Sequence, residues 1–506
     1  MKAHLMFRDR DIGPGAGPSP ALEALVQDLE LDTLFDAMGG GDAFIRDTAV
    51  KGVLASLDDP GEIVYRQGVL ADCLAHPDVV RDIYDLAVEA ITREKHVWAG
   101  IFGREPQQLL HRSVEVLGIF VELLRRLRAI ADANRDAFES DGFRQFFGMI
   151  EGELDDAYLA SLEAHGDRLE FRGGLQISAG LGTGNKGTDY VLRTPPRRKR
   201  GLLDMVFGER SPYVYTIADR DEAGFHALGE LRNRGLALAA GALAQSTDHI
   251  LSFFVMLRTE LAFYLGGLTL HQRLAVKGEP TCVPRVAPGD RPALSCRGIY
   301  DVCLSLTVNE RVVGNEVDAA GKALVVITGA NRGGKSTFLR AAGLAQLMMQ
   351  CGMFVGAESF AANLCDGIFT HYRREEDSTM TSGKFDEELG RMATIVDEIR
   401  PTSLVLFNES FSATNEREGS EIARQVVRAL VDSGVKVLYV THLYDLAGGF
   451  YREQRDDALF LRAERRDDGR RTFRLPEGEP LPTSHGGDVF RRIFGGSPSR
   501  TPGAAG

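Results

Sequence analysis

The first third of the chain repeats apolar residues at the three- and four-residue spacing that is typical of amphipathic helices. The pattern runs from Pro20 to about Ala99 and is interrupted at Asp59-Pro60, where one helix is expected to end and another to begin. It continues through residues 112–133 and 143–165, each of which we interpret as one further helix. The chain therefore opens with a helical bundle.

Two stretches of different character follow. Residues 169–219 are rich in glycine and contain short β-like runs at residues 175–178, 190–193 and 213–217, which predict a small irregular β insertion. A helical pattern returns from residue 221 to about residue 276 and is the longest in the chain. Glycine weakens a helix, so a break is expected in the first half of this stretch. The glycines concerned are Gly224, Gly229, Gly235 and Gly241.

The second half of the chain alternates short β-branched apolar runs with helical segments, which predicts a parallel sheet. Three such runs cover residues 324–328, 402–407 and 435–440. Residues 297–317 are expected to add strands before the first run. A hairpin around Asp467-Asp-Gly469 is expected after the last run.

A phosphate-loop pattern, G-x-x-x-x-G-K-[ST], follows the first of these strands at residues 329–336. Its glycines let backbone N–H groups turn inward around phosphate oxygens, and the next helix adds its N-terminal partial charge. Lys335 is expected to neutralise the β- and γ-phosphates, and the Ser336 hydroxyl to coordinate Mg²⁺. A chance glycine-rich turn is the alternative, but the flanking strand and helix argue against it.

The other two strands also end in polar residues. Asn408 and Glu409 follow one strand, and His442 follows the other. Ligands of an open parallel sheet bind beyond the carboxyl ends of its strands, so these side chains are expected to gather beside the phosphate loop. Acidic residues at such a strand end hold Mg²⁺ and orient the attacking water in phosphate-loop enzymes.

Charge, apolar runs and cysteine spacing argue against several classes of protein. A net charge of −13 argues against a protein that coats nucleic acid by its overall charge, although a local basic patch can still bind it. No uninterrupted apolar run is long enough to cross a bilayer, so no membrane partner is expected. The six cysteines form no C-x-x-C pair and no signal peptide is present, so we expect reduced thiols in a cytoplasmic protein.

The nucleotide motifs resemble those of the MutS family of mismatch-repair ATPases. TGANRGGKST is similar to the family's TGPNMGGKST, SLVLFNES to SLVLMDE, and VTHLYDL to ATHYHEL. Residues 382–388 resemble the family's S-x-F-x-x-E stretch. The resemblance implies an α/β P-loop ATPase domain of the ABC-like type with a mostly parallel sheet. A largely α-helical core and lever domain with a small β insertion would precede it.

The resemblance also implies roles for individual residues. Glu409 would position the attacking water, His442 would sense the γ-phosphate, and Lys335 would act with them in catalysis. Ser336 and Asn408 would hold Mg²⁺, the latter through water. Ser382, or its neighbour Gly383, would reach the ATP of the partner in a homodimer with composite sites. The implied nucleotide-binding residues are Gly329, Asn331, Gly333, Gly334, Lys335, Ser336, Thr337, Val312 and Ser382.

Three departures from the family pattern affect this site. Asn408 stands where the family usually has Asp, which removes a negative charge that Mg²⁺ favours. Val312 falls where an aromatic residue often stacks on adenine. Residues 410–415 replace a glycine-rich turn that carries subunit contacts. We therefore expect a slow ATPase that needs high Mg²⁺.

The resemblance divides the chain into six parts. They are a flexible N-terminal segment (1–20), a helical core (21–168), a β-rich basic insertion (169–220), lever-type helices (221–280), the ATPase domain (291–495) and a disordered tail (496–506). The insertion holds the clearest basic cluster of the chain, which is either a solvated loop or a contact for nucleic acid or a partner. Its members are Arg197, Arg198, Lys199 and Arg200.

Three functions remain open at this point. The resemblance implies an ATP-driven dimeric clamp that acts on DNA in mismatch repair or recombination. No Phe-x-Glu wedge of the mismatch readers precedes the helical core, so we expect the mismatch-reading domain to be lacking. The alternatives are a clamp for branched nucleic acid, RNA or a protein assembly, and a nucleotide-regulated assembly factor with negligible turnover.

Overall fold

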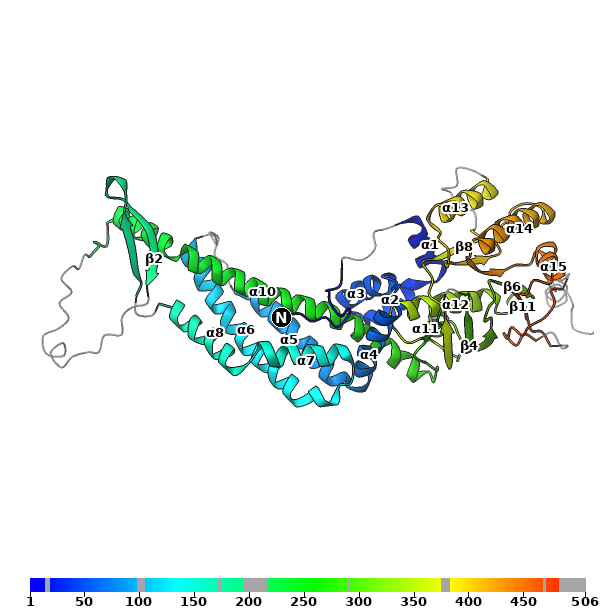
Figure 1. The fold of residues 1–506 in the computed structure, drawn as a ribbon, viewed down its shortest axis with the longest axis horizontal. Coiled ribbons are helices and arrows are strands. Elements are labelled where there is room, and N and C mark those ends of the chain that lie inside the picture. The colour runs from blue at the N-terminus through cyan, green and yellow to red at the C-terminus, as the bar shows by residue number, and fades with distance from the viewer. Residues whose placement is uncertain are drawn as a thin grey trace, which may run out of the picture. The chain divides into compact units, whose positions relative to one another are not determined.

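A computed structural model describes residues 1–13, 19–97, 105–171, 174–193, 216–289, 291–374, 383–466 and 470–481. The chain divides into two compact units (Figure 1). Unit 1 comprises residues 1–4, 78–139 and 143–260, and unit 2 comprises residues 5–77, 140–142 and 261–506. The basic cluster at 197–200, the turn at 467–469 and the tail from residue 496 lie outside the described residues, and the six predicted domain boundaries stay predictions.

A five-stranded parallel sheet lies at the core of unit 2. Its strands are nearly all buried, as expected of a parallel sheet that is covered on both faces. The three strands predicted from the sequence are confirmed to within two residues at each end. In spatial order the strands are β11 (Ala458–Ala463), β6 (Leu324–Gly329), β10 (Lys436–Val440), β9 (Leu404–Asn408) and β8 (Ile368–Tyr372).

Four helices pack against this sheet: α12 (Lys335–Gln350), α13 (Lys384–Glu398), α14 (Glu416–Asp432) and α15 (Tyr444–Arg452). Side chains alternate across a strand, so Val405 and Phe407 of β9 join the apolar cluster that includes α13, α14 and α15. Leu406 points to the other face, where it lies against Gly343 of α12. The helix predicted after the phosphate loop is confirmed and begins at Lys335, two residues earlier than expected.

A second, four-stranded sheet of unit 2 contains β3 (Arg285–Val286), β7 (Ser359–Ala362), β4 (Leu294–Ile299) and β5 (Asn315–Asp318) in that order. The strands predicted within residues 297–317 are only partly right, because a short helix, α11 (Val302–Thr307), separates β4 from β5. The buried carboxylate of Asp301 accepts the N–H of Leu304 at 2.9 Å and starts this helix.

The helices predicted near the N-terminus are confirmed: α1 (Pro20–Asp28), α2 (Leu31–Gly39), α3 (Ala43–Leu54), α4 (Pro60–Ala75) and α5 (Pro77–His96). The break at Asp59-Pro60 is also confirmed. Asp59 Oδ1 accepts the N–H of Gly61 at 2.9 Å, and Pro60 occupies the first helical position, where its missing N–H costs nothing.

Further along the chain come α6 (Pro106–Asn134), a 3₁₀ turn η1 (Arg135–Ala137), α7 (Asp141–Glu153) and α8 (Asp156–Leu169). The single helix predicted for residues 143–165 is therefore wrong. Asp155 accepts the N–H of Tyr158 at 2.6 Å, which caps a new helix and ends the old one. The β insertion is confirmed as an antiparallel pair, β1 (Gln176–Leu181) and β2 (Gly187–Arg193), joined through η2 (Thr183–Asn185).

The longest helix, α10 (Glu222–Val276), is continuous over 55 residues. The predicted break among its glycines is therefore wrong. At Gly235 an added Cβ would lie 2.4 Å from Cδ1 of Ile177 in β1, so this glycine permits close packing of the helix against the strand. Each glycine costs a helix only about 1 kcal/mol, which such packing can offset.

By length and composition α10 is also a candidate membrane span, which the sequence-based expectation did not allow for. One such helix is weak evidence, because the core helix of a soluble protein meets the same criteria. Of the most apolar 18-residue window of α10, 67% is buried inside the protein, which matches a core helix.

Two glycines of α10 provide a test of this packing. Gly229→Ala is expected to stabilise the helix by about 0.5–1 kcal/mol, because alanine is the better helix former and an added Cβ meets nothing within 4 Å. Gly235→Ala should bring no such gain, since its Cβ would collide with Ile177. Native-state amide exchange within α10 measures the opening free energy of both variants. Equal stabilisation by the two substitutions would contradict the close approach of β1.

Candidate functional site

Glycines shape the loop between β6 and α12. Gly329 and Gly334 have φ angles of +111° and +91°, which residues with a side chain rarely adopt. A Cβ on Gly329 would lie 2.8 Å from the backbone N of Ala463, and one on Gly333 would lie 2.7 Å from the Cβ of Ala463. The edge strand β11 thus packs against the loop. Gly329 and Gly333 have no room for a side chain, and Gly329 and Gly334 have backbone angles that disfavour one.

The Lys335 side chain folds over this loop. Its ammonium donates to the carbonyl oxygens of Gly329 and Ala330 at 3.0 and 3.3 Å and to Oδ1 of Asn331 at 3.4 Å. Lys335 is only 5% exposed, and burial lowers the pKa of its amine, while the Glu409 carboxylate acts in the opposite direction. A buried cation that is held by neutral carbonyl groups is suited to receive a polyanion.

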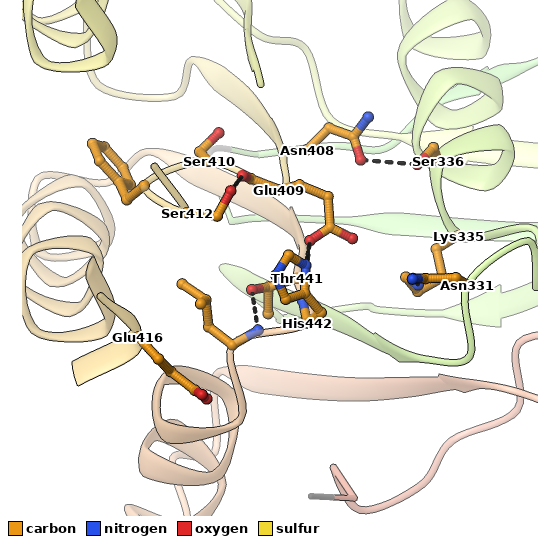
Figure 2. Close-up of polar contacts among 12 residues, drawn as sticks. Asn331, Lys335, Ser336, Asn408, Glu409, Ser410, Ser412, Glu416, Thr441 and His442 are labelled. Atoms are coloured by element: carbon orange, nitrogen blue, oxygen red, sulfur yellow. Dashed lines mark hydrogen bonds and ion pairs between the residues drawn. The ribbon is translucent and has the colours of Figure 1, made fainter. Parts of the chain in front are cut away.

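Ser336 and Asn408 meet across the sheet edge. The Ser336 hydroxyl donates to Oδ1 of Asn408 at 2.9 Å, as Figure 2 shows. Both residues supply oxygen atoms, which are the ligands that Mg²⁺ prefers. Both oxygens are neutral, so this pair fits Mg²⁺ less strongly than a hydroxyl with a carboxylate would.

Glu409 follows Asn408 in an unusual backbone conformation. Its φ angle is +56°, and such a left-handed residue costs about 1–3 kcal/mol and persists only where its surroundings enforce it. Its N–H donates to the carbonyl of Val440 at 2.9 Å, which ties it to the end of β10. The side chain therefore points along the sheet edge toward His442 (Figure 2).

Glu409 and His442 form an ion pair. Glu409 Oε2 pairs with Nδ1 of the His442 ring and also accepts the His442 backbone N–H at 3.2 Å. This hydrogen bond raises the pKa of His442 above its usual value of 6.5, although burial opposes the shift. The His442 ring and the Glu409 carboxylate lie at the same edge as Lys335, Ser336 and Asn408, so the structure brings these five predicted residues together.

The remaining predicted residues are placed less closely. Thr337 lies in the first turn of α12. Val312 lies in the loop between α11 and β5, where its N–H donates to Oε1 of Glu279 at 2.9 Å. Ser382 falls outside the described residues, which resume at Gly383 just before α13.

Sequence reasoning missed Arg471. Its guanidinium donates to the carbonyl oxygen of Asn331 in the phosphate loop. Burial is the main cause of the lowered pKa of Lys335, and the positive charge of Arg471 lowers it further. The only signal in the sequence was the density of arginines beside the predicted hairpin turn, which does not indicate a direction or a partner.

Comparisons with known proteins match two parts of the chain. A family profile described as the MutS2 N-terminal domain matches residues 58–277, and one described as MutS domain V matches residues 325–486. The second match contains Lys335, Ser336, Asn408, Glu409 and His442.

Relatives named DNA mismatch repair protein MutS show the same similarity. The protein from Thermus caldophilus is 36% identical over 370 residues, which are 68% of this chain and 44% of that protein. Those from Chloroflexus aurantiacus and Thermotoga maritima are 35% identical over 145 residues and 39% over 125 residues. These stretches are 28% and 25% of this chain and 15% and 16% of those proteins, so each match spans less than half of the relative.

The Glu409–His442 pair predicts a raised histidine pKa that titration of the ring by NMR can measure. We expect Glu409→Gln to lower the pKa of His442 to 6.5 or below, because burial then acts without the carboxylate. Since the folded protein binds this proton more tightly, the pair stabilises the fold below pH 6.5, and that contribution is lost as the pH rises through the folded pKa.

Glu416→Gln is the matched control for this titration, since the Glu416 carboxylate accepts the backbone N–H of Tyr444 at 3.0 Å and is not the carboxylate paired with the His442 ring. It should leave the titration of His442 unchanged. A wild-type pKa at or below 6.5, or an unchanged pKa in Glu409→Gln, would contradict the pairing.

Proposed function

The chain belongs to the MutS family, and from this premise we propose that it binds ATP with Mg²⁺ and hydrolyses the nucleotide slowly. One observation carries the proposal. The carboxyl edge of a single parallel sheet, which we assign to the P-loop ATPase fold, gathers an ammonium, a hydroxyl, an amide oxygen, a carboxylate and an imidazole. This set has the parts that phosphoryl transfer to water needs.

Each side chain has a distinct task in this proposal. Lys335 exchanges the loop carbonyls for phosphate oxygens, and the backbone N–H groups of the glycine loop surround the same phosphates. Ser336 and Asn408 hold the metal ion, which neutralises charge on the phosphate oxygens when it is bound. Glu409 orients the attacking water, and His442, which is hydrogen-bonded to Glu409, senses the γ-phosphate and adjusts the carboxylate.

The proposed setting of this chemistry is a cytoplasmic homodimer with composite ATP sites that acts as a clamp on DNA in mismatch repair or recombination. The relatives are named as DNA mismatch repair proteins, which supports a role in DNA repair, and the match to MutS domain V covers the site. The neutral Asn408 favours one alternative, in which nucleotide binding regulates assembly with negligible turnover. A clamp on branched nucleic acid, RNA or a protein assembly is the other.

A filter-binding screen separates these possibilities. Duplex, mismatched and branched DNA are each tested with ATP, ADP or no nucleotide, and turnover is measured with and without the retained ligand. Nucleotide-dependent retention of DNA supports the clamp. Retention of no DNA in any state argues against it.

Glu409→Gln tests the catalytic assignment. The variant should bind labelled ATP with Mg²⁺ about as well as wild type, because Lys335 and Ser336 are unchanged, and its turnover should fall at least about a hundredfold. Glu416→Gln removes a carboxylate from the start of the neighbouring helix and should keep both properties. Unimpaired turnover in Glu409→Gln would remove Glu409 from the mechanism, and a wild-type protein that binds no ATP would overturn the proposed function.

Asn408→Asp tests the metal site. A carboxylate beside Ser336 should reduce the Mg²⁺ concentration that gives half-maximal turnover by about tenfold, because Mg²⁺ prefers charged oxygen ligands. Asn415→Asp adds the same charge at the cap of α14, where Asn415 Oδ1 accepts the N–H of Glu418 at 3.0 Å, and should change nothing. An identical Mg²⁺ dependence of wild type and Asn408→Asp would exclude Asn408 as a metal ligand.

A further inference from the structure

The turn that carries Glu409 is strained in two places. Glu409 and Phe411 both have left-handed backbones, with φ angles of +56° and +59°, and neither is a glycine. Such conformations persist only where surrounding contacts enforce them. The contacts that enforce this turn therefore also decide where the Glu409 carboxylate points.

Glu388 of α13 provides one of these contacts. Its side chain is 4% exposed, and Oε1 accepts the N–H of Phe411 at 3.2 Å. Burial raises the pKa of this carboxyl, and the hydrogen bond from Phe411 and the charge of Arg391 act against that shift. Burying a carboxyl group costs free energy unless it is hydrogen-bonded. The bond from the Phe411 N–H therefore stabilises both Glu388 and the turn.

His371 of β8 links the same helix to the same turn. Burial lowers the pKa of His371 to about 4, so the ring is neutral near pH 7 and carries one proton. Nε2 lies 3.0 Å from the carbonyl oxygen of Glu388, which can only accept, so the proton is on Nε2. Nδ1 then presents its lone pair to Oγ of Ser410 at 2.8 Å, and the same hydroxyl also donates to the backbone carbonyl oxygen of His371, so both acceptors of His371 face Ser410. The ring also stacks on Phe411, with centroids 5.3 Å apart and planes at 19°.

Other elements close the turn from the remaining sides. The hydroxyl of Tyr439 in β10 donates to the carbonyl oxygen of Ser410 at 2.8 Å. Gly419 of α14 lies so close that a Cβ there would be 2.2 Å from the carbonyl oxygen of Phe411. These contacts come from the sheet and from α14, whereas Glu388 is the contact that depends on where α13 lies.

We infer that Glu388 and His371 are positioning residues that hold Glu409 at the sheet edge and thereby make turnover depend on the position of α13. Glu388 acts through its carboxylate on Phe411 and through its carbonyl on His371, which holds Ser410. Neither residue touches the nucleotide in this inference, which rests on the proposed ATPase function. A displacement of α13 would release the turn without altering Lys335 or Ser336.

The test compares variants of α13 by turnover and ATP affinity. Glu388→Ala should lower kcat about ten- to a hundredfold, because Glu409 is misplaced, and should change the Kd for ATP less than about threefold. Glu388→Gln keeps an oxygen that accepts from Phe411 and should recover kcat to within about threefold of wild type. Glu398→Ala, an exposed position of the same helix, is the matched control and should leave both quantities unchanged.

Titration of the His442 ring by NMR gives a second readout that needs no ATP. Release of Glu409 in Glu388→Ala should lower the pKa of His442 toward 6.5 or below, whereas Glu398→Ala should not. If Glu388→Ala does not fold, Ser410→Ala removes only the hydroxyl that bonds to His371 and should lower both kcat and the His442 pKa.

The outcomes separate this inference from the proposed function. A wild-type protein without ATP turnover contradicts the function, and the His442 titration then decides alone whether Glu388 positions Glu409. If wild type hydrolyses ATP and Glu388→Ala changes neither kcat nor the titration, the inference is wrong. Parallel losses of kcat and ATP affinity that Glu388→Gln does not restore would show a merely structural role and overturn it as well.

Discussion

The in-register pairing of β6, β10 and β9 is the constraint on which the rest of the site depends. Val440 lies opposite Asn408 on one side and opposite Ile327 on the other, so the three strands end at the same level. Polar groups that follow them must emerge at one edge, whatever the loops between them do. A slip of one residue in β9 would send its buried side chains to the opposite face of the sheet. The apolar core therefore fixes the register of the strands, and the register brings the polar side chains of the site to one edge of the sheet.

This part of the molecule could be predicted from the sequence because its signals are local. A short buried run predicts a strand, a glycine-rich loop with Lys335 predicts a phosphate site, and Asp59 before Pro60 predicts a helix start. The residues that hold Glu409 could not be predicted in the same way. Glu388 lies 23 positions before Phe411, and His371 lies 39 positions before Ser410. No spacing rule connects them, and the left-handed backbone of Glu409 has no glycine to indicate it.

The two helical errors have different causes. Propensity predicted that the glycines of α10 would break the helix, but packing against β1 at Gly235 makes a small residue useful there. Propensity also joined α7 to α8, because neither proline nor glycine separates them. The carboxylate of Asp155 supplies the N-cap that starts α8. At Gly235 tertiary context thus overrides a weak intrinsic preference, whereas at Asp155 the propensity argument missed a local cap between residues three positions apart.

Ala463 shows that the shape of the phosphate loop also depends on a residue outside the site. It belongs to the edge strand β11, carries no reactive group and lies more than a hundred positions from the phosphate loop, yet Gly329 and Gly333 both lie against it. The methyl group of Ala463 limits the space beside both glycines and so helps to fix the shape of the phosphate loop. A valine or leucine at Ala463 would place a larger side chain against both glycines, so the shape of the phosphate loop depends on a residue that has no reactive group.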